Sequence, residues 1–194
     1  MPTPNTLSTD AAVAVLMAPG CEEVEALAVV DCLYRAGIRA DLIAVSDSET
    51  IESSHSIRIV CDLLLSEAVL ADYALLFLPG GMPGTLVLAD SPVVADELER
   101  RVRASGPVAA ICAAPSILAD RGLLDGRRAT ANPSFMDALR AGGATALEDP
   151  VVVDGEILTS RGMGTSAELG LALVRYMLGD DAAAAVATGI VYQG

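Results

Sequence analysis

Short, continuous apolar runs that stop at proline or glycine constrain this chain more than any other feature of its sequence. Residues 13–18 form one such run before Pro19, and residues 74–78 form another before Pro79. Runs of this length without polar alternation are typical of strands that are buried on both faces of a sheet. Helical segments separate them, so the sequence predicts an α/β fold: a mostly parallel sheet with helices on both faces.

The other elements follow from local signals. Asp154-Gly155 predicts a two-residue hairpin turn between two short strands, and residues 165–168 read as a capping box that opens a helix. The predicted strands are 13–18, 39–45, 57–61, 74–78, 128–131, 151–153 and 156–159, with one more directly before Cys112. The predicted helices are 22–36, 91–104, 135–140, 165–178 and 181–187.

The length and composition fit one compact domain, since the chain has 194 residues of which 53% are hydrophobic. We expect residues 13–194 to form that domain and residues 1–12 to form a flexible N-terminal tail. Residues 1–10 carry no basic group and no apolar core, so they do not resemble a secretory signal. No apolar run approaches the length of a membrane span. We therefore expect a cytoplasmic protein.

Charge and cysteine content narrow the possible partners. The net charge of −14 argues against nucleic acid and against anionic membranes, because both attract basic patches. Four cysteines, Cys21, Cys32, Cys61 and Cys112, show no paired spacing, and His55 is the only histidine. The sequence therefore offers too few suitably spaced cysteine and histidine ligands for a zinc site of the Cys/His type. We expect no bound metal and four reduced thiols.

Cys112 occupies a position that suits a reactive cysteine. Residues 106–119 predict a buried strand, a tight corner and a helix, with Cys112 at the corner and Pro115 near the first helical position. The positive end of a helix favours a thiolate over a thiol, and α/β hydrolases present their nucleophile on the same kind of corner. The alternative interpretation is that Cys112 is a small buried hydrophobic residue.

Three predicted loops lie at the same edge of the predicted sheet as this corner. They are residues 19–25, 79–84 and 111–115, each of which follows a strand. Ligand sites of open α/β sheets lie at the carboxyl ends of the strands. The convergence of these loops favours a functional site around Cys112.

Four motifs in these regions resemble the ThiJ/PfpI superfamily, and most closely its Parkinson-associated branch, which includes bacterial glyoxalases, deglycases and chaperones. The motifs are residues 20–25, 78–81, 110–115 and 158–166, in the same order as in the family. The resemblance runs from about Val13 to the end of the predicted helix 165–178. It implies a flavodoxin-like three-layer sandwich with a cysteine nucleophile elbow, a homodimer, and no cofactor.

The resemblance also assigns roles to individual residues. It makes Cys112 the nucleophile and Glu25 its partner acid, and it favours an oxyanion hole formed by the backbone amides of Gly81 and Ala113. Residues expected to line the pocket are Gly80, Asn132 and Met163. Taken alone, Glu25 could equally be an acidic residue of a first helical turn, and the two glycines a plain turn. Cys21 is a candidate resolving thiol for oxidised Cys112.

Two positions depart from the family pattern. The peptidase branch has a histidine directly after the cysteine, whereas this chain has Ala113, which argues against proteolysis. Many relatives in the Parkinson-associated branch have a histidine where this chain has Asn132. Proton transfer would then depend on Glu25, on water, or on Asn132 as a hydrogen-bonding substitute. We expect His55 to be exposed or to face a dimer partner.

These observations lead to one preferred function and two alternatives. The preferred function is a cofactor-free glyoxalase III or deglycase that converts methylglyoxal or glyoxal to hydroxy acids through Cys112 and Glu25. The first alternative is a redox-responsive protective protein, sensor or chaperone, that uses oxidation of Cys112. The second is a hydrolase or hydratase that acts on another small electrophile. The residues do not rank the substrates.

Overall fold

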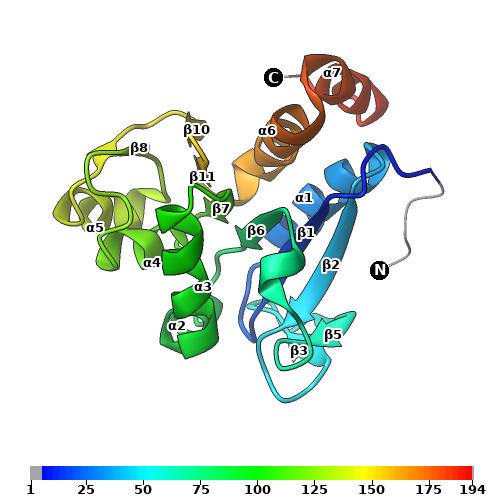
Figure 1. The fold of residues 1–194 in the computed structure, drawn as a ribbon. Helices are drawn as coiled ribbons and strands as arrows, with labels where there is room; N and C mark the ends of the chain where they lie inside the picture. Colours follow the sequence, from blue (N-terminus) through cyan, green and yellow to red (C-terminus); the bar gives the residue numbers. More distant parts are fainter. Residues whose placement is uncertain (1–5, 194) are drawn as a thin grey trace.

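The computed structural model describes residues 6–193, and its main feature is a seven-stranded sheet (Figure 1). Residues 1–5 of the predicted tail lie outside the described part of the chain, and the first strand begins at Ala12. The strand order is β10-β11-β7-β6-β1-β2-β5, and every neighbouring pair is parallel except β10 with β11. The strands are β1 (Ala12–Met17), β2 (Arg39–Ala44), β5 (Leu63–Leu64), β6 (Leu75–Leu78), β7 (Val108–Ile111), β10 (Val151–Asp154) and β11 (Ile157–Ser160).

Helices cover both faces of this sheet. One face packs against α1 (Glu23–Arg35), α6 (Ser166–Leu178) and α7 (Asp180–Gly189). The other face packs against α2 (Gly84–Asp90), α3 (Pro92–Arg103), α4 (Pro115–Asp120) and α5 (Met136–Ala141). The predicted flavodoxin-like three-layer sandwich is therefore confirmed. Three short 3₁₀ helices, Leu70–Asp72, Pro133–Phe135 and Met163–Thr165, complete the helical elements of the described residues.

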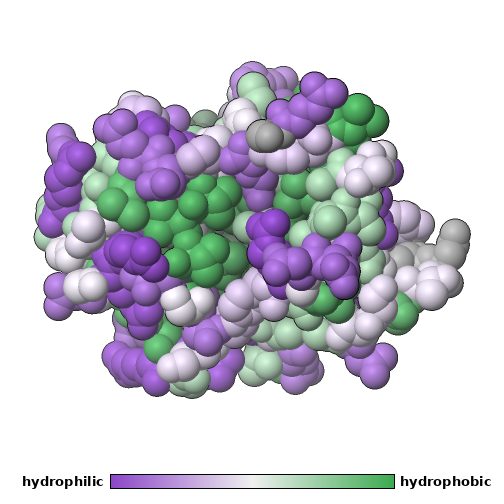
Figure 2. Space-filling view, turned by 90° about the horizontal axis from the view of Figure 1, so that it is seen from above, coloured by the Kyte–Doolittle hydropathy of each residue, from purple (hydrophilic) through white to green (hydrophobic). Residues whose placement is uncertain are grey.

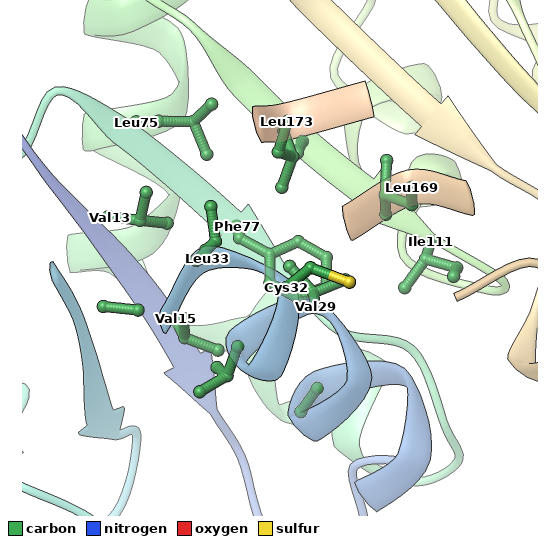
Figure 3. Close-up of a cluster of buried hydrophobic side chains, with 14 of the residues drawn as sticks. Val13, Val15, Val29, Cys32, Leu33, Leu75, Phe77, Ile111, Leu169 and Leu173 are labelled. Atoms are coloured by element: carbon green, nitrogen blue, oxygen red, sulfur yellow. The ribbon is translucent and has the colours of Figure 1, made fainter. Parts of the chain in front are cut away.

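The core beside α1 fixes the helix that carries the candidate acid. Figure 3 shows Val29 and Leu33 of α1 together with Phe77 of β6 and with Leu169 and Leu173 of α6. All five side chains are fully buried. Burying each of them contributes about 1.5–3 kcal/mol relative to exposure. This packing holds the first turn of α1 at a fixed position relative to the sheet.

A glycine allows α6 to approach α1 closely. A Cβ atom added at Gly170 would lie 2.8 Å from both Cβ and Sγ of Cys32 and 3.3 Å from Cα of Val29. No real side chain fits in that space, so the contact between the two helices requires glycine.

The structure corrects several predicted elements. The strand predicted at 57–61 is β4 (Arg58–Val60), which pairs with β3 (Thr50–Glu52) in a separate hairpin and not with the main sheet. Its burial alternates between exposed and buried residues, as in a strand with one face in solvent. The strand predicted at 128–131 is only β8 (Arg128–Ala129), paired with β9 (Thr145–Ala146).

Helix 91–104 is confirmed as α3, but the sequence analysis missed α2, which precedes it. The predicted capping box at residues 165–168 is wrong, because the side chain of Thr165 does not cap α6. Its Oγ1 accepts a hydrogen bond from the backbone N–H of Gly162 at 3.1 Å and lies 2.7 Å from Oγ of Ser160. The Thr165 hydroxyl therefore stabilises the loop between β11 and α6. Its contacts with Gly162 and Ser160 take the place of a hydrogen bond to the first turn of α6.

Figure 2 shows hydrophilic residues over much of one face, with an apolar area between them. None of the described helices is both long enough and apolar enough to cross a membrane.

Candidate active site

Cys112 lies at the sharp bend between β7 and α4. Its φ is +65°, the left-handed region that a residue other than glycine rarely adopts. The surrounding backbone holds it there: its N–H donates to the carbonyl of Ser160 at 2.9 Å, and its carbonyl accepts from the N–H of Asn132 at 3.0 Å. Strained backbone of this kind persists only where neighbouring contacts determine it. The predicted elbow is present.

Glu25 lies in the first turn of α1 and is almost completely buried, with 1% of its surface exposed. Its Oε2 accepts a hydrogen bond from the N–H of Gly80 at 3.0 Å, and the N–H of Met163 also donates to the carboxyl. The N-cap residue Glu22 accepts from the N–H of Glu25 through Oε2 at 2.6 Å. Loops after two different strands therefore hold the carboxyl in one orientation.

The structure brings Glu25 and Cys112 into direct contact, since a hydrogen bond joins the carboxyl and the thiol. A Cβ atom added at Gly162 would lie 3.8 Å from both Cys112 Sγ and Glu25 Oε1, so this glycine borders both groups. The N–H groups of Gly81 and Ala113 also donate hydrogen bonds to the sulfur. Both amides that the sequence analysis assigned to an oxyanion hole thus lie beside the sulfur.

Gly80 permits the carboxyl and the thiol to meet. A Cβ atom at this position would lie 2.6 Å from Oε2 of Glu25, 2.7 Å from Cβ of Cys112 and 2.8 Å from the carbonyl oxygen of Ile111. Any side chain would push the two groups apart. The backbone of Gly80 therefore packs directly against both the carboxyl and the thiol, which is consistent with its prediction as a pocket residue.

The electrostatic surroundings of Cys112 favour the neutral thiol over the expected thiolate. Burial, followed by the charge of Glu25 and its hydrogen bond with the thiol, raises the pKa of Cys112 to about 12, against the lowering effect of the Ala113 and Gly81 amides. While Glu25 is ionised, Cys112 is a thiol, and the predicted thiolate at neutral pH is wrong for this state.

Glu25 is the group of the pair that titrates near neutrality. Burial raises the pKa of Glu25 to about 7; the hydrogen bond from Cys112 lowers it and the charge of Glu22 raises it further. Because the two acids are in contact, they titrate as a pair. The Glu25 carboxylate is hydrogen-bonded to the thiol and has a pKa suited to a general base. The arrangement can activate the sulfur by taking its proton at the moment of reaction.

Because the pKa of Glu25 is raised in the folded protein, we expect the free energy of unfolding to fall as pH rises from about 4.5 to about 7. Glu25 has a pKa of about 7 in the folded protein and an ordinary value of 4.5. Within this window the folded state keeps the proton that the unfolded state has lost. The stabilisation is complete below the ordinary pKa and is lost as pH rises through the folded pKa, by up to about 3 kcal/mol.

Urea denaturation across this pH range measures the effect. The free energy of unfolding of the wild type is expected to fall with pH, and this part of the slope is expected to disappear in Glu25→Gln. An unchanged slope in the variant would assign the pH dependence to other groups.

The two other predicted pocket residues lie at the mouth of the site. Met163 is 56% exposed. The Nδ2 atom of Asn132 is 3.7 Å from the position that a Cβ of Gly162 would occupy, and its Oδ1 accepts from the N–H of Ser134. Asn132 thus caps the following 3₁₀ helix and faces the glycine that borders the sulfur.

The other cysteines are buried. Cys21 is fully buried, and burial, followed by the charges of Cys61 and Glu23, raises its pKa to about 12. Burial also raises the pKa of both Cys32 and Cys61 to about 11. Because Cys21 is fully buried, a reagent in solution cannot reach its sulfur, so we assign no step to Cys21. Cys112 is the one cysteine that is partly exposed.

Residue-by-residue analysis of the sequence missed three features of the site. Ser160 and Gly162 lie in a motif that was noted, yet their roles at the elbow depend on pairing between β11 and β7. His55 approaches the first turn of α1, with Nδ1 2.9 Å from Oε1 of Glu23. Only long-range pairing reveals these contacts, because the partners are far apart in the sequence.

Comparisons with known proteins point to one family. Residues 11–176 match the DJ-1/PfpI family. The zebrafish Parkinson disease protein 7 homolog is 34% identical over 179 residues, which cover 91% of this chain and 95% of that protein. The glutathione-independent glyoxalase DJR-1.2 of Caenorhabditis elegans is 33% identical over 168 residues, covering 86% and 89%. The crystal structure of Drosophila melanogaster DJ-1beta matches with a TM-score of 0.90 and 32% identity, covering 96% of this chain and 100% of that one.

These matches span nearly the whole chain and agree with the fold. They confirm the resemblance that the four sequence motifs indicated, including its Parkinson-associated branch. With the elbow, the sheet order and the sequence match in agreement, the chain belongs to the DJ-1/PfpI family.

Proposed function

We propose that this protein is a cofactor-free glyoxalase III or deglycase that converts small dicarbonyls such as methylglyoxal and glyoxal to hydroxy acids. The observation that carries the proposal is the buried hydrogen bond between Glu25 and the partly exposed Cys112. A nucleophile in contact with a base of pKa about 7 suits addition to an aldehyde. The similarity to a glutathione-independent glyoxalase of Caenorhabditis elegans supports the same chemistry.

The first step forms a bond between sulfur and carbon. Sγ of Cys112 attacks the aldehyde carbon of methylglyoxal while its proton passes to the Glu25 carboxylate. The carbonyl π electrons move to oxygen, and the N–H groups of Gly81 and Ala113 stabilise the developing negative charge. Glu25 then returns the proton to this oxygen. The product is a hemithioacetal, and the carboxylate is regenerated.

The second step moves hydrogen from the first carbon to the second. Glu25 removes the C–H proton of the hemithioacetal, giving an enediolate with its negative charge on the second oxygen. Glu25 then gives this proton to the second carbon, while the hydroxyl proton passes from the first oxygen to the second. The result is a lactoyl thioester on Cys112. Water attacks this thioester, the C–S bond breaks, and the thiol recovers its proton. Overall, one methylglyoxal and one water give one lactate, without an oxidant or reductant.

The test is lactate formation from a panel of small electrophiles that includes methylglyoxal and glyoxal. We expect the wild type to convert methylglyoxal to one equivalent of lactate, and protein whose thiol is first alkylated with iodoacetamide to form none. Consumption of dicarbonyl without lactate, or equal rates before and after alkylation, would refute the proposal. Turnover of a different electrophile alone would favour another hydrolase or hydratase.

A second candidate function is a redox-responsive protective protein. It is favoured by the exposure of Cys112, which is the only partly exposed thiol of the described residues. A sulfinic acid formed there would find hydrogen-bond donors in a protonated Glu25 and in the amides of Gly81 and Ala113. Intact mass after mild peroxide tests it: a gain of two oxygens confined to Cys112, with negligible dicarbonyl consumption, supports this function over the first.

We further propose a homodimer, which the family resemblance implies, and a cytoplasmic location, which the sequence analysis expects. Apolar side chains on α1 and on the β3-β4 hairpin are exposed in the single chain: Val24 (43%), Leu27 (39%), Ile57 (48%) and Val60 (68%). Their burial against a second copy would remove this apolar surface from water. Analytical ultracentrifugation measures the oligomeric state.

A further inference from the structure

We propose that Glu22, Glu23 and His55 form a binding site for one divalent transition-metal ion, with Zn²⁺ as its best-suited occupant. The two glutamates are the N-cap and the first residue of α1. The histidine lies in the turn between β3 and β4. This site lies beside the Cys112–Glu25 pair, since Glu22 also accepts from the N–H of Glu25, but it does not depend on the proposed glyoxalase activity.

The geometry brings three metal-ligating atoms together. The Nδ1 atom of His55 is 2.9 Å from Oε1 of Glu23 and 3.9 Å from Oε1 of Glu22. One ligand atom from each residue lies within 4.8 Å of the others. The His55 side chain is 64% exposed, so its ring can move the short distance that brings all three atoms to about 2.0–2.2 Å from one ion.

An unpartnered oxygen independently indicates a ligand. Oε2 of Glu23 is buried and has no hydrogen-bond partner among the described residues, and the side chain is only 10% exposed. A buried carboxylate oxygen without a partner costs free energy. A cation bound between Glu23 and His55 would neutralise the charge of this carboxylate.

Each ligand has an atom available for the ion. Glu22 uses Oε2 to accept from the N–H of Glu25, which leaves Oε1 to face His55. Nδ1 of His55 also lies 3.3 Å from Oγ of Ser54, so the Ser54 hydroxyl competes with the ion for this nitrogen. When the ion binds, a proton held between Nδ1 and Glu23 moves to Nε2 or to solvent, because a ligating nitrogen must be unprotonated.

The donor set selects the class of ion. One imidazole nitrogen with two carboxylates suits Zn²⁺ and similar divalent ions of the first transition series, whereas Mg²⁺ and Ca²⁺ prefer oxygen donors alone and Cu(I) prefers sulfur. In the single chain, the exposed histidine leaves the remaining coordination positions open to water. The net charge of −14 attracts cations in general. The sequence analysis did not predict this site, because it considered only cysteine and histidine as zinc ligands and two of the three ligands here are carboxylates.

The single histidine makes a direct test possible, because the chain gives one set of imidazole signals in NMR. Zn²⁺ is titrated into protein labelled with ¹⁵N at histidine, in the Cys112→Ser background so that the exposed thiol cannot bind zinc. We expect binding of one ion per chain and a large shift of the Nδ1 signal, with little change at Nε2. A shift at Nε2 instead, or zinc binding without any shift of the histidine, would overturn the proposal.

Variants complete the test. Glu23→Gln and His55→Ala are each expected to weaken zinc binding at least about 10-fold, in line with the loss of one ligand. The matched control is Glu52→Gln, which removes a neighbouring exposed carboxylate that is not a ligand and should leave the affinity within about twofold. Equal weakening by all three variants would show that only the general negative charge attracts the ion, which would also refute the site.

Discussion

Replacing Cys112 by serine is expected to reduce lactate formation from methylglyoxal by at least about 10³-fold. The reason is the acidity of the attacking group. Glu25, with a pKa of about 7, can take a proton from a thiol in contact with it, whereas a serine hydroxyl is far less acidic. The proton transfer that accompanies attack then becomes strongly unfavourable. Steady-state assays of lactate production over a range of methylglyoxal concentrations measure this loss.

The fold is expected to survive this change. Serine differs from cysteine by one atom, and the backbone bonds that hold the elbow come from Ser160 and Asn132. The matched control is Cys32→Ser, which changes a buried thiol between α1 and α6 and should leave turnover within about twofold of the wild type. Turnover retained by Cys112→Ser at the wild-type rate would refute nucleophilic catalysis by this residue.

The sequence was most informative where one segment determines its own structure. The apolar runs that became β1 and β6 have no polar alternation, and both are buried throughout. The Asp154-Gly155 turn specifies the β10-β11 hairpin by itself. By contrast, β3 and β9 have three and two residues. Strands that short carry too little periodic signal, so pairing with a distant partner decides their structure.

The site shows the same division. The loops around Gly80 and Cys112 follow buried strands, and parallel topology alone places them at one edge of the sheet. The charge state of the pair could not be predicted, because it depends on a balance between burial, the proximity of Glu25 and two backbone amides. Likewise, the approach of His55 to Glu23 depends on how the β3-β4 hairpin packs on α1.

Replacing Glu25 by glutamine is expected to lower kcat for methylglyoxal about 10²–10⁴-fold, with a smaller effect on KM. Glutamine has the same shape and can still accept from the N–H of Gly80, but it cannot take the proton of Cys112 or of the hemithioacetal. Glu25→Asp keeps an acid while withdrawing it from the sulfur, so it should retain more activity than Glu25→Gln. Activity retained by Glu25→Gln but lost in Glu25→Asp would indicate that the carboxyl acts only through its shape.

The pH profile separates a base from a structural residue. If Glu25 acts as the base, wild-type kcat/KM rises with pH through about 7, the pKa of this carboxyl in the folded protein, and Glu25→Gln lacks this rise. Glu22→Gln is the matched variant, assayed with EDTA to keep metal ions away from the neighbouring carboxylates. The charge of Glu22 raises the pKa of Glu25, so its removal should move the rise to lower pH while kcat/KM at high pH stays near the wild-type value. A rise that stays in place in Glu22→Gln, or that survives in Glu25→Gln, would assign the titration to a different group.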